Sequence, residues 1–204
     1  MPQSEVVVLA KSIKHQKYCV AGKCVKTGQW IRPVSNLQGG ELSNKQTQIK
    51  NPFGTFGVKV LHKAKIGLAQ HAPLIHQPDN YLIDGTVWVQ NYTFNPANLN
   101  TLLDTPNDLW GADNRLDYAE IVAGLHNISQ SLYLVKVDNL NLYHSADGNR
   151  RASFTYGGIN YDLPSTDPQF GNIVSQNLPT SGILCVSLGE EYKGYCYKIV
   201  ATIF

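Results

Sequence analysis

Hydrophobic and polar positions alternate with a period of two along most of this chain, which is the pattern of β-strands rather than of helices. In FGVKVLHKAKI, residues 56–66, one set of alternate positions is mostly apolar and the other is rich in lysine. A strand with one buried and one solvated side shows this alternation. Similar runs predict further strands at residues 5–12, 17–23, 29–35, 86–94 and 131–145.

Turn-forming residues connect these runs into hairpins. KTG joins the runs at 17–23 and 29–35, ADGNR follows 131–145, and a Gly-Gly pair divides RASFTYGGINYDLP, residues 151–164. Asp-Gly and Gly-Gly pairs favour hairpin turns because they tolerate positive φ. Residues 182–204 predict a terminal hairpin, and NPANLNTLLDTP, residues 95–106, predicts a short helix. We therefore predict a mainly β protein of about nine or ten strands with one or two short helices.

The alternating pattern is interrupted near residues 104–120, where proline, glycine and acidic residues gather. A chain of 204 residues is long enough for two small domains. We place the division there and predict two domains, residues 1–104 and 105–204.

Charge is distributed unevenly between these halves. Up to Ile66 the chain has eleven basic and two acidic residues, a net charge of +9, whereas the remainder carries −7. A concentrated positive field attracts polyanions, so nucleic acid or a nucleotide is the first ligand class to consider. The alternative is a solvated lysine surface that balances an acidic second half, which could itself face a protein partner.

No motif of a known catalytic or metal site is present. The spacings of the cysteines (19, 24, 185 and 196) and of the histidines fit neither zinc nor thioredoxin-like chemistry, and there is no phosphate-binding GxxxxGK[ST] loop. We expect reduced, packed cysteines, no catalytic residue, no metal and no cofactor. The N-terminus lacks a signal-peptide pattern and no apolar run is long enough to span a membrane, so we expect a cytoplasmic protein without membrane partners.

The order of several short motifs resembles the dual OB-containing domain family of bacteria. These motifs are VVVLAKS, KYCVAGK followed by GQWIRPVS, DNYLID, YDLPSTDP, and CVSLGE leading into YKIVATIF, and they extend over almost the whole chain. The resemblance implies two tandem OB-like β-barrels that bind nucleic acid or a nucleotide-like ligand. It also implies a setting in prokaryotic conflict or defence systems, and it does not imply a known catalytic reaction.

OB barrels bind ligands on their middle strands and neighbouring loops, with aromatic residues for stacking and basic residues for the backbone. Trp30 and Arg32 stand two positions apart on one predicted strand, so they share a face, and Ser35 follows them. We predict that these three residues bind the ligand and that Lys59, Lys63 and Lys65 steer it. The alternative is that Trp30 fills the barrel and Arg32 pairs with an acid.

The second half offers its own candidates. Thr166 and Asp167 lie between two prolines and provide a hydroxyl and a carboxylate on a stiffened loop, although such a pair also makes a local turn. Lys198 lies on the last predicted strand, where an ungapped comparison of residues 18–34 with 184–200 aligns it with Arg32. We predict that all three bind the ligand.

The sequence therefore predicts a nucleic-acid or nucleotide-binding protein without catalysis of its own. Two alternatives stay open: a metal-dependent nuclease or nucleotide hydrolase, and an adaptor that binds proteins.

Overall fold

A computed structural model describes residues 3–14, 17–175 and 181–204. The chain divides into two compact units, residues 1–102 (unit 1) and 103–204 (unit 2). Unit 1 contains β1 (Gln3–Lys14), β2 (Lys17–Cys24), β3 (Trp30–Val34), η1 (Lys45–Thr47), β4 (Gln48–Asn51), β5 (Gly54–Gly57), β6 (His62–His71), β7 (Asn80–Ile83), β8 (Trp88–Thr93) and η2 (Pro96–Leu102). Unit 2 contains β9 (Arg115–Asp117), α1 (Tyr118–Val122), β10 (Leu132–His144), β11 (Arg150–Tyr156), β12 (Ile159–Pro164), α2 (Phe170–Val174), β13 (Ser181–Tyr192) and β14 (Tyr195–Ile203).

Five strands of unit 1 form a closed barrel. The order is β1-β2-β3-β7-β6, and β6 pairs back onto β1 from Gln3↔Gly67 to Val7↔Lys63. The β3–β7 pair is parallel and the other seams are antiparallel. The third strand of the barrel thus pairs with the fifth, and the fourth closes onto the first, which is the topology of an OB barrel. Alternate residues such as Val6, Val20 and Ile66 fill its interior.

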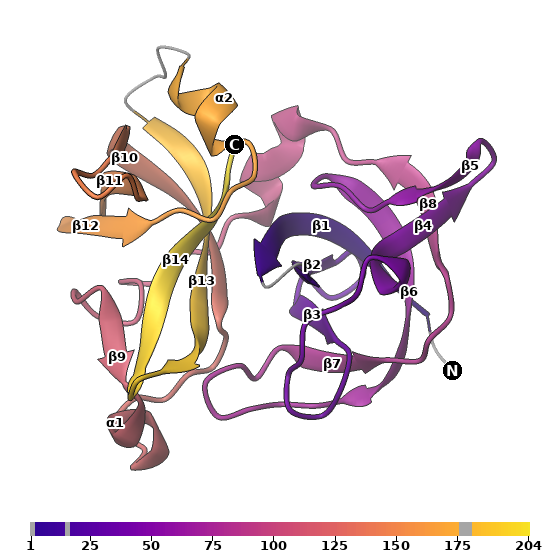
Figure 1. Cartoon of the computed structure of the whole chain (residues 1–204), viewed down its shortest axis with the longest axis horizontal. Coiled ribbons are helices and arrows are strands. Elements are labelled where there is room, and N and C mark those ends of the chain that lie inside the picture. The colour runs from indigo at the N-terminus through magenta and orange to yellow at the C-terminus, as the bar shows by residue number, and fades with distance from the viewer. Residues whose placement is uncertain (1–2, 15–16, 176–180) are drawn as a thin grey trace. The chain divides into compact units, whose positions relative to one another are not determined.

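Three further strands extend the sheet of unit 1 beyond β6. β8 pairs antiparallel with β6, β4 pairs in parallel with β8, and β5 completes a hairpin with β4 (Figure 1). Ile49 and Trp88 of these strands are buried in the same core as the barrel strands. The sheet therefore presents a second, outward side along β4, β8 and β6.

Unit 2 repeats the barrel order with different strands. β10, β11 and β12 are consecutive antiparallel neighbours, and β13 pairs with both β10 and β14. A single parallel bridge, Ser165↔Val200, brings the end of β12 to β14. α2 lies between β12 and β13, and its Phe170 is fully buried in the core with Phe154 and Tyr161.

The two barrels and the two short α-helices confirm the mainly β fold with two OB-like domains. One predicted strand is broken. Residues 58–61 form no strand, and Leu61 has a φ of 68°, so the alternation at 56–66 spans the end of β5 and the start of β6. The interrupted region 104–120 also contains β9 and the start of α1, which the sequence did not indicate. The helix predicted at 95–106 is a 3-10 helix, η2.

Candidate functional site

A row of lysines lies on the outward side of β4, β8 and β6. In the strand register, Lys50 pairs with Val89, Val89 pairs with Lys65, and Lys63 pairs with Tyr92. Their neighbours Ile49, Trp88, Ala64 and Ile66 point into the core. We call the five outward residues, Lys50, Lys63, Lys65, Val89 and Tyr92, the basic face.

Tyr92 is the aromatic centre of the basic face. It is 71% exposed, and Lys63 Nζ lies 5.9 Å from the centroid of its ring. Lys50, Lys65, Val89 and Tyr92 line a groove of about 640 Å³. In the part of the chain that the structure describes, neither the Lys50 nor the Lys65 side chain forms a hydrogen bond or an ion pair. The groove therefore combines an exposed ring with cations that are free to bind an anion.

Hydrogen bonds hold the strands around the groove. Asn51 Nδ2 donates to Gln90 Oε1 at 3.0 Å, which ties β4 to β8. Asn91 Nδ2 donates to Glu5 Oε1 at 2.5 Å, which ties β8 to β1. These bonds fix the strands that carry the lysines, so the spacing of the charges is preorganised.

Further positive charge accumulates beside the basic face. Lys59 is exposed, and its backbone N–H donates to Nδ1 of His62 at 3.2 Å. Burial and then repulsion from Lys59 and Lys11 lower the pKa of His62. Burial and then repulsion from Lys59 also lower the pKa of Lys11. Burial is the larger cause of both pKa shifts, and the smaller contribution from repulsion shows that positive charges gather at this end of β6, where Lys59 is predicted to steer a ligand.

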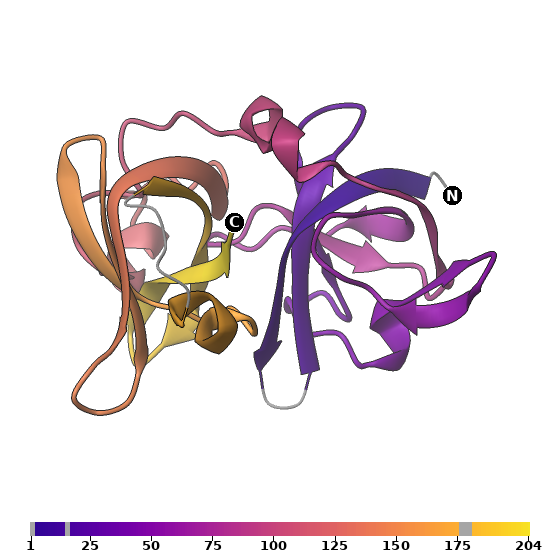
Figure 2. The same ribbon diagram turned by 90° about the horizontal axis from the view of Figure 1, so that it is seen from above.

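The structure places Trp30 and Arg32 on another part of unit 1. Trp30 is only 4% exposed, and Lys23 Nζ lies 5.3 Å from the centroid of its ring. The same Nζ donates to the carbonyl of Leu102 at 2.7 Å and so ties the end of η2 to β2. Figure 2 shows the ribbon of η2 beside the strands of unit 1. A ring buried in this way offers little surface for stacking. Trp30 is nevertheless not part of the barrel core cluster that contains its neighbour Ile31.

Arg32 and Ser35 are both half-buried. The backbone N–H of Arg32 donates to the Asp79 carbonyl at 2.8 Å, and that of Ser35 donates to Gly40 at 2.9 Å. Neither residue lines the groove of the basic face. Of the residues predicted to bind, only Lys63 and Lys65 come together on that face, with Lys59 nearby in the chain.

Unit 2 contains a separate pocket of about 790 Å³. Its walls include Arg115, Asp117, Arg151, Tyr195 and Tyr197, which come from β9, β11 and β14. The Arg115 guanidinium carbon lies 3.8 Å from the centroid of the Tyr195 ring, and Arg115 Nη1 donates to the Tyr197 hydroxyl at 3.3 Å. The two tyrosines therefore hold this guanidinium at the pocket.

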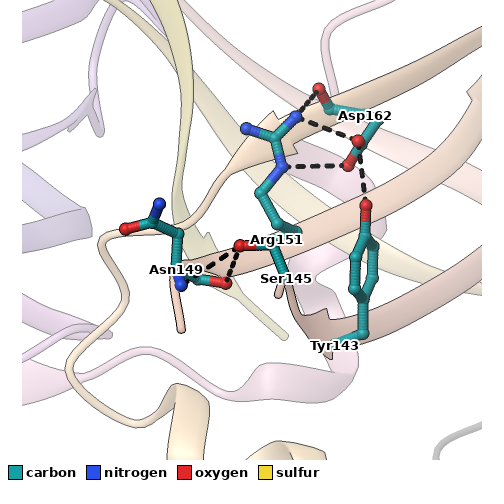
Figure 3. A network of polar contacts seen from close by, with 5 residues as sticks. All are labelled: Tyr143, Ser145, Asn149, Arg151 and Asp162. Atoms are coloured by element: carbon teal, nitrogen blue, oxygen red, sulfur yellow. Dashed lines mark hydrogen bonds and ion pairs between the residues drawn. The ribbon is translucent and has the colours of Figure 1, made fainter. Parts of the chain in front are cut away.

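Arg151, the second arginine of the pocket, differs from Arg115 because it forms an ion pair with a carboxylate (Figure 3). Its Nη2 lies 2.9 Å from Asp162 Oδ2, and its Nε donates to Oδ1 at 3.2 Å. The Tyr143 hydroxyl donates to the same carboxylate at 2.9 Å. This network joins β10, β11 and β12 and stiffens the wall to which Arg151 belongs.

Lys198 lies beneath the pocket rather than at its surface. Its side chain is fully buried, and Nζ donates to the Gly111 carbonyl at 2.7 Å, which also accepts from the Tyr161 hydroxyl at 3.1 Å. Gly111 lines the pocket. Burial lowers the pKa of Lys198 to about 8, although Asp108 and Asp113 act in the opposite direction. Lys198 thus anchors a pocket segment from below.

Thr166 and Asp167 join the end of β12 to β14. Thr166 is exposed, and its backbone N–H donates to the Val200 carbonyl at 2.9 Å. Asp167 is 3% exposed; its Oδ1 accepts from the Gln169 N–H at 2.7 Å and its Oδ2 from the Ile203 N–H at 2.8 Å. Both carboxylate oxygens are thus used inside unit 2, as the local-turn alternative suggests.

No cluster of metal-ligating side chains is assembled among residues 3–14, 17–175 and 181–204. No three of their His, Cys, Asp or Glu side chains come together as a metal site, and the four cysteines are free thiols. Within the same ranges, no helix is long and apolar enough to cross a membrane.

The model of the dual OB-containing domain matches residues 4–203. The chain belongs to the dual OB-containing domain family. The ligand face of an OB barrel is formed by its second and third strands together with adjacent loops. In the second OB barrel of this family member, those strands are β11 and β12, and their Arg151 and Pro164 line the pocket.

Other comparisons add little to the family assignment. A solved structure described as "Crystal structure of the tetrameric p202 HIN2" matches with a TM-score of 0.32 and 8% identity, covering 98% of this chain and 88% of that chain. A TM-score this low does not establish a shared fold. No curated protein matches the chain.

Several residues of the two sites were not predicted from the sequence. They are Lys50, Val89 and Tyr92 on the basic face and Arg115, Tyr195 and Tyr197 at the pocket. The alternation in residues 86–94 could have marked Val89 as outward, and the Tyr-x-Tyr spacing could have placed both tyrosines on one side of a strand. No local pattern indicates that Lys50 lies beside Val89, because strand pairing brings them together.

Proposed function

We propose that this protein binds single-stranded nucleic acid through the basic face of unit 1. The observation that carries the proposal is the exposed Tyr92 ring, which shares one groove with Lys50 and Lys65 and lies 5.9 Å from Lys63 Nζ beside that groove. Proteins that bind single strands combine a positive groove, which follows the phosphates, with aromatic rings on which bases stack. Tyr92 supplies the stacking surface and the lysines supply the charge.

The charge of the whole unit supports the same ligand. Unit 1 has eleven basic and four acidic residues, a net charge of +7, whereas unit 2 carries −5. A field of this sign increases the association rate of polyanions. Duplex DNA presents its bases inside the helix, whereas a single strand exposes them to Tyr92, so the proposal favours single strands.

The proposed activity is binding without catalysis. We place it in prokaryotic conflict or defence systems, as the family resemblance implies, and in the cytoplasm, where such systems meet nucleic acid. The adaptor alternative predicts a protein partner whose binding survives nuclease treatment, and the hydrolase alternative predicts products from nucleic acid with Mg²⁺ or Mn²⁺.

A charge-matched pair of triple variants tests the proposal. The variant Lys50→Ala, Lys63→Ala, Lys65→Ala removes the cations of the basic face. The control Lys17→Ala, Lys26→Ala, Lys45→Ala removes the same charge from exposed residues of unit 1 outside the groove. Binding of a labelled oligonucleotide is measured by fluorescence anisotropy for both and for the wild type.

We expect the basic-face variant to bind about 10-fold or more weakly than the control, because three phosphate contacts are lost in one and only long-range attraction in the other. An equal loss of affinity in both variants would show that binding depends only on the net charge of the protein and would refute a local site.

The variant Tyr92→Leu removes a stacking partner and should weaken binding of the oligonucleotide by about 1–3 kcal/mol. An unchanged affinity for Tyr92→Leu would remove Tyr92 from the interface.

A further inference from the structure

The pocket of unit 2 holds a cation whose charge is not neutralised. Arg115 is exposed, and its contacts are the ring of Tyr195 and the ring and hydroxyl of Tyr197. Among the described residues no carboxylate pairs with it, whereas the second arginine of the pocket, Arg151, is neutralised by Asp162. A guanidinium fixed by neutral partners retains its capacity to bind an anion such as phosphate in a bidentate manner.

The stacking of Arg115 also leaves a surface for a planar group. Its guanidinium carbon lies over the Tyr195 ring, 3.8 Å from the ring centroid, so the tyrosine covers part of the guanidinium. Arginine planes stack on nucleobases as well as on aromatic side chains. The exposed face of Arg115 can therefore receive a planar ligand inside a pocket of about 790 Å³.

Hydrogen-bond acceptors complete the pocket. Asp113 is exposed and has no hydrogen-bond partner among the described residues. Asp117 uses Oδ1 to accept from the Ala119 N–H at 2.8 Å, which leaves Oδ2 for a ligand. Carboxylates of this kind accept hydrogen bonds from sugar hydroxyls and from the N–H groups of bases. A ligand with an anionic group alone would meet repulsion from these acids.

We propose that this pocket is a second binding site, for a nucleoside phosphate. Arg115 contacts the phosphate or stacks on the base, and Asp113 and Asp117 accept hydrogen bonds from the sugar or the base. The pocket shares no residue with the basic face. The failure of either site therefore leaves the other proposal standing.

The segment that forms one side of the pocket is held in a defined position. Trp110 and Gly111 have positive φ values of 55° and 86°, and Gly111 N donates to Asp108 Oδ1 at 2.6 Å. The Gly111 carbonyl accepts from both Lys198 and Tyr161. These bonds fix the backbone at Gly111, two residues before Asp113, so this part of the pocket wall is preorganised.

Isothermal titration of the full chain with AMP, GMP, CMP, the matching nucleosides and inorganic phosphate tests this inference. Arg115→Gln should weaken binding of at least one nucleotide by roughly 10- to 100-fold, the effect of losing a charge-assisted hydrogen bond. Lys136→Ala removes an equal charge from an exposed position of β10 outside the pocket and should leave that affinity unchanged. Asp113→Asn, at an exposed side chain, should weaken binding of the nucleotide and of its nucleoside alike.

Three outcomes would overturn the inference. They are the absence of binding by every nucleotide tested, an Arg115→Gln variant that binds as tightly as wild type, and inorganic phosphate that binds as tightly as the nucleotides. Circular dichroism of Arg115→Gln shows whether the variant is folded. If it is unfolded, Arg115→Lys replaces it, because lysine keeps the charge and loses the stacking and bidentate geometry. A Lys variant that binds as wild type would then contradict the role of Arg115.

Discussion

The buried amine of Lys198 makes the stability of unit 2 depend on pH. Burial lowers its pKa to about 8, whereas an unfolded lysine titrates near 10.4. Between these values the unfolded state binds more protons than the folded state, so the free energy of unfolding rises as pH increases through this range. The charged form is therefore the costly one at neutral pH, even though it donates to the Gly111 carbonyl.

Lys198→Met should remove this dependence, because methionine fills similar space and carries no proton. Between about pH 7 and about pH 9.5, we expect the unfolding free energy of the wild type to rise relative to that of the variant. Urea denaturation of both proteins across that range measures the difference. A constant difference would show that Lys198 does not titrate within it.

Asp167 stabilises unit 2 through two backbone hydrogen bonds from a buried carboxylate. Asp167→Ala leaves the N–H groups of Gln169 and Ile203 without this acceptor, and we expect a loss of about 2–4 kcal/mol in unfolding free energy. Thr166→Ala, at an exposed neighbour whose backbone bond is kept, should change stability by less than about 0.5 kcal/mol. Denaturation midpoints compare the two; equal effects would contradict the structural role of Asp167.

The burial of Trp30 could not be predicted from its neighbours in the sequence. Alternation correctly gives Trp30 and Ile31 opposite sides of β3, since Ile31 enters the core and Trp30 does not. Its burial depends on Lys23 and on η2, which is held there by a hydrogen bond between residues 79 positions apart. Nothing in the local pattern indicates such a contact.

The two barrels differ in how their last seam closes. In unit 1 the parallel seam between β3 and β7 has three paired positions, beginning at Arg32↔Asn80. In unit 2 the equivalent seam is the isolated bridge Ser165↔Val200, with the Thr166 N–H donating to Val200. A seam with fewer hydrogen bonds opens at lower cost.

We therefore expect the amide of Thr166 to exchange with solvent about tenfold or more faster than that of Arg32, after correction for intrinsic rates. Arg32 is the matched reference because its N–H donates across the corresponding seam of unit 1. Hydrogen exchange followed by NMR measures both amides. Equal protection would mean that the two seams are equally stable.

Strands with long alternation were predictable because each buries one side against a core. The sequence indicates strands at the positions of β10, β11, β12, β13 and β14. It also indicates the turn at Gly157 and Gly158 that joins β11 to β12. β9 has only three residues, too few for a period to show, and it exists because it pairs with β14. The break at Leu61 is likewise non-local: its N–H donates to Val8, and its carbonyl accepts from Phe94.

The same limit applies to the basic face. Alternation placed Lys63 and Lys65 on one side of a strand, as β6 shows. Lys50 and Tyr92 join them only through the pairing of β4, β8 and β6, so the groove is a product of tertiary structure. Charge and periodicity therefore identified Lys63 and Lys65, whereas the position of Tyr92 beside them depends on the order of the strands in the sheet.

Charge divides the protein into a basic unit 1 and an acidic unit 2, and the proposed sites follow that division. The face of unit 1 presents free lysines to a polyanion, whereas the pocket of unit 2 combines one free arginine with carboxylates. A long nucleic-acid strand is attracted by the lysines of unit 1 and repelled by the carboxylates of unit 2. A single nucleotide is small enough to use the arginine and the carboxylates together.

A salt titration of oligonucleotide binding tests the proposed interface most directly. Each phosphate neutralised on a single strand contributes about −0.7 to the slope of log K against log salt concentration. The slope for Lys50→Ala, Lys63→Ala, Lys65→Ala should therefore be shallower than that of the wild type by about 2, with the charge-matched control close to wild type. A wild type that binds no single strand, or a triple variant with an unchanged slope, would contradict the interface proposed for unit 1.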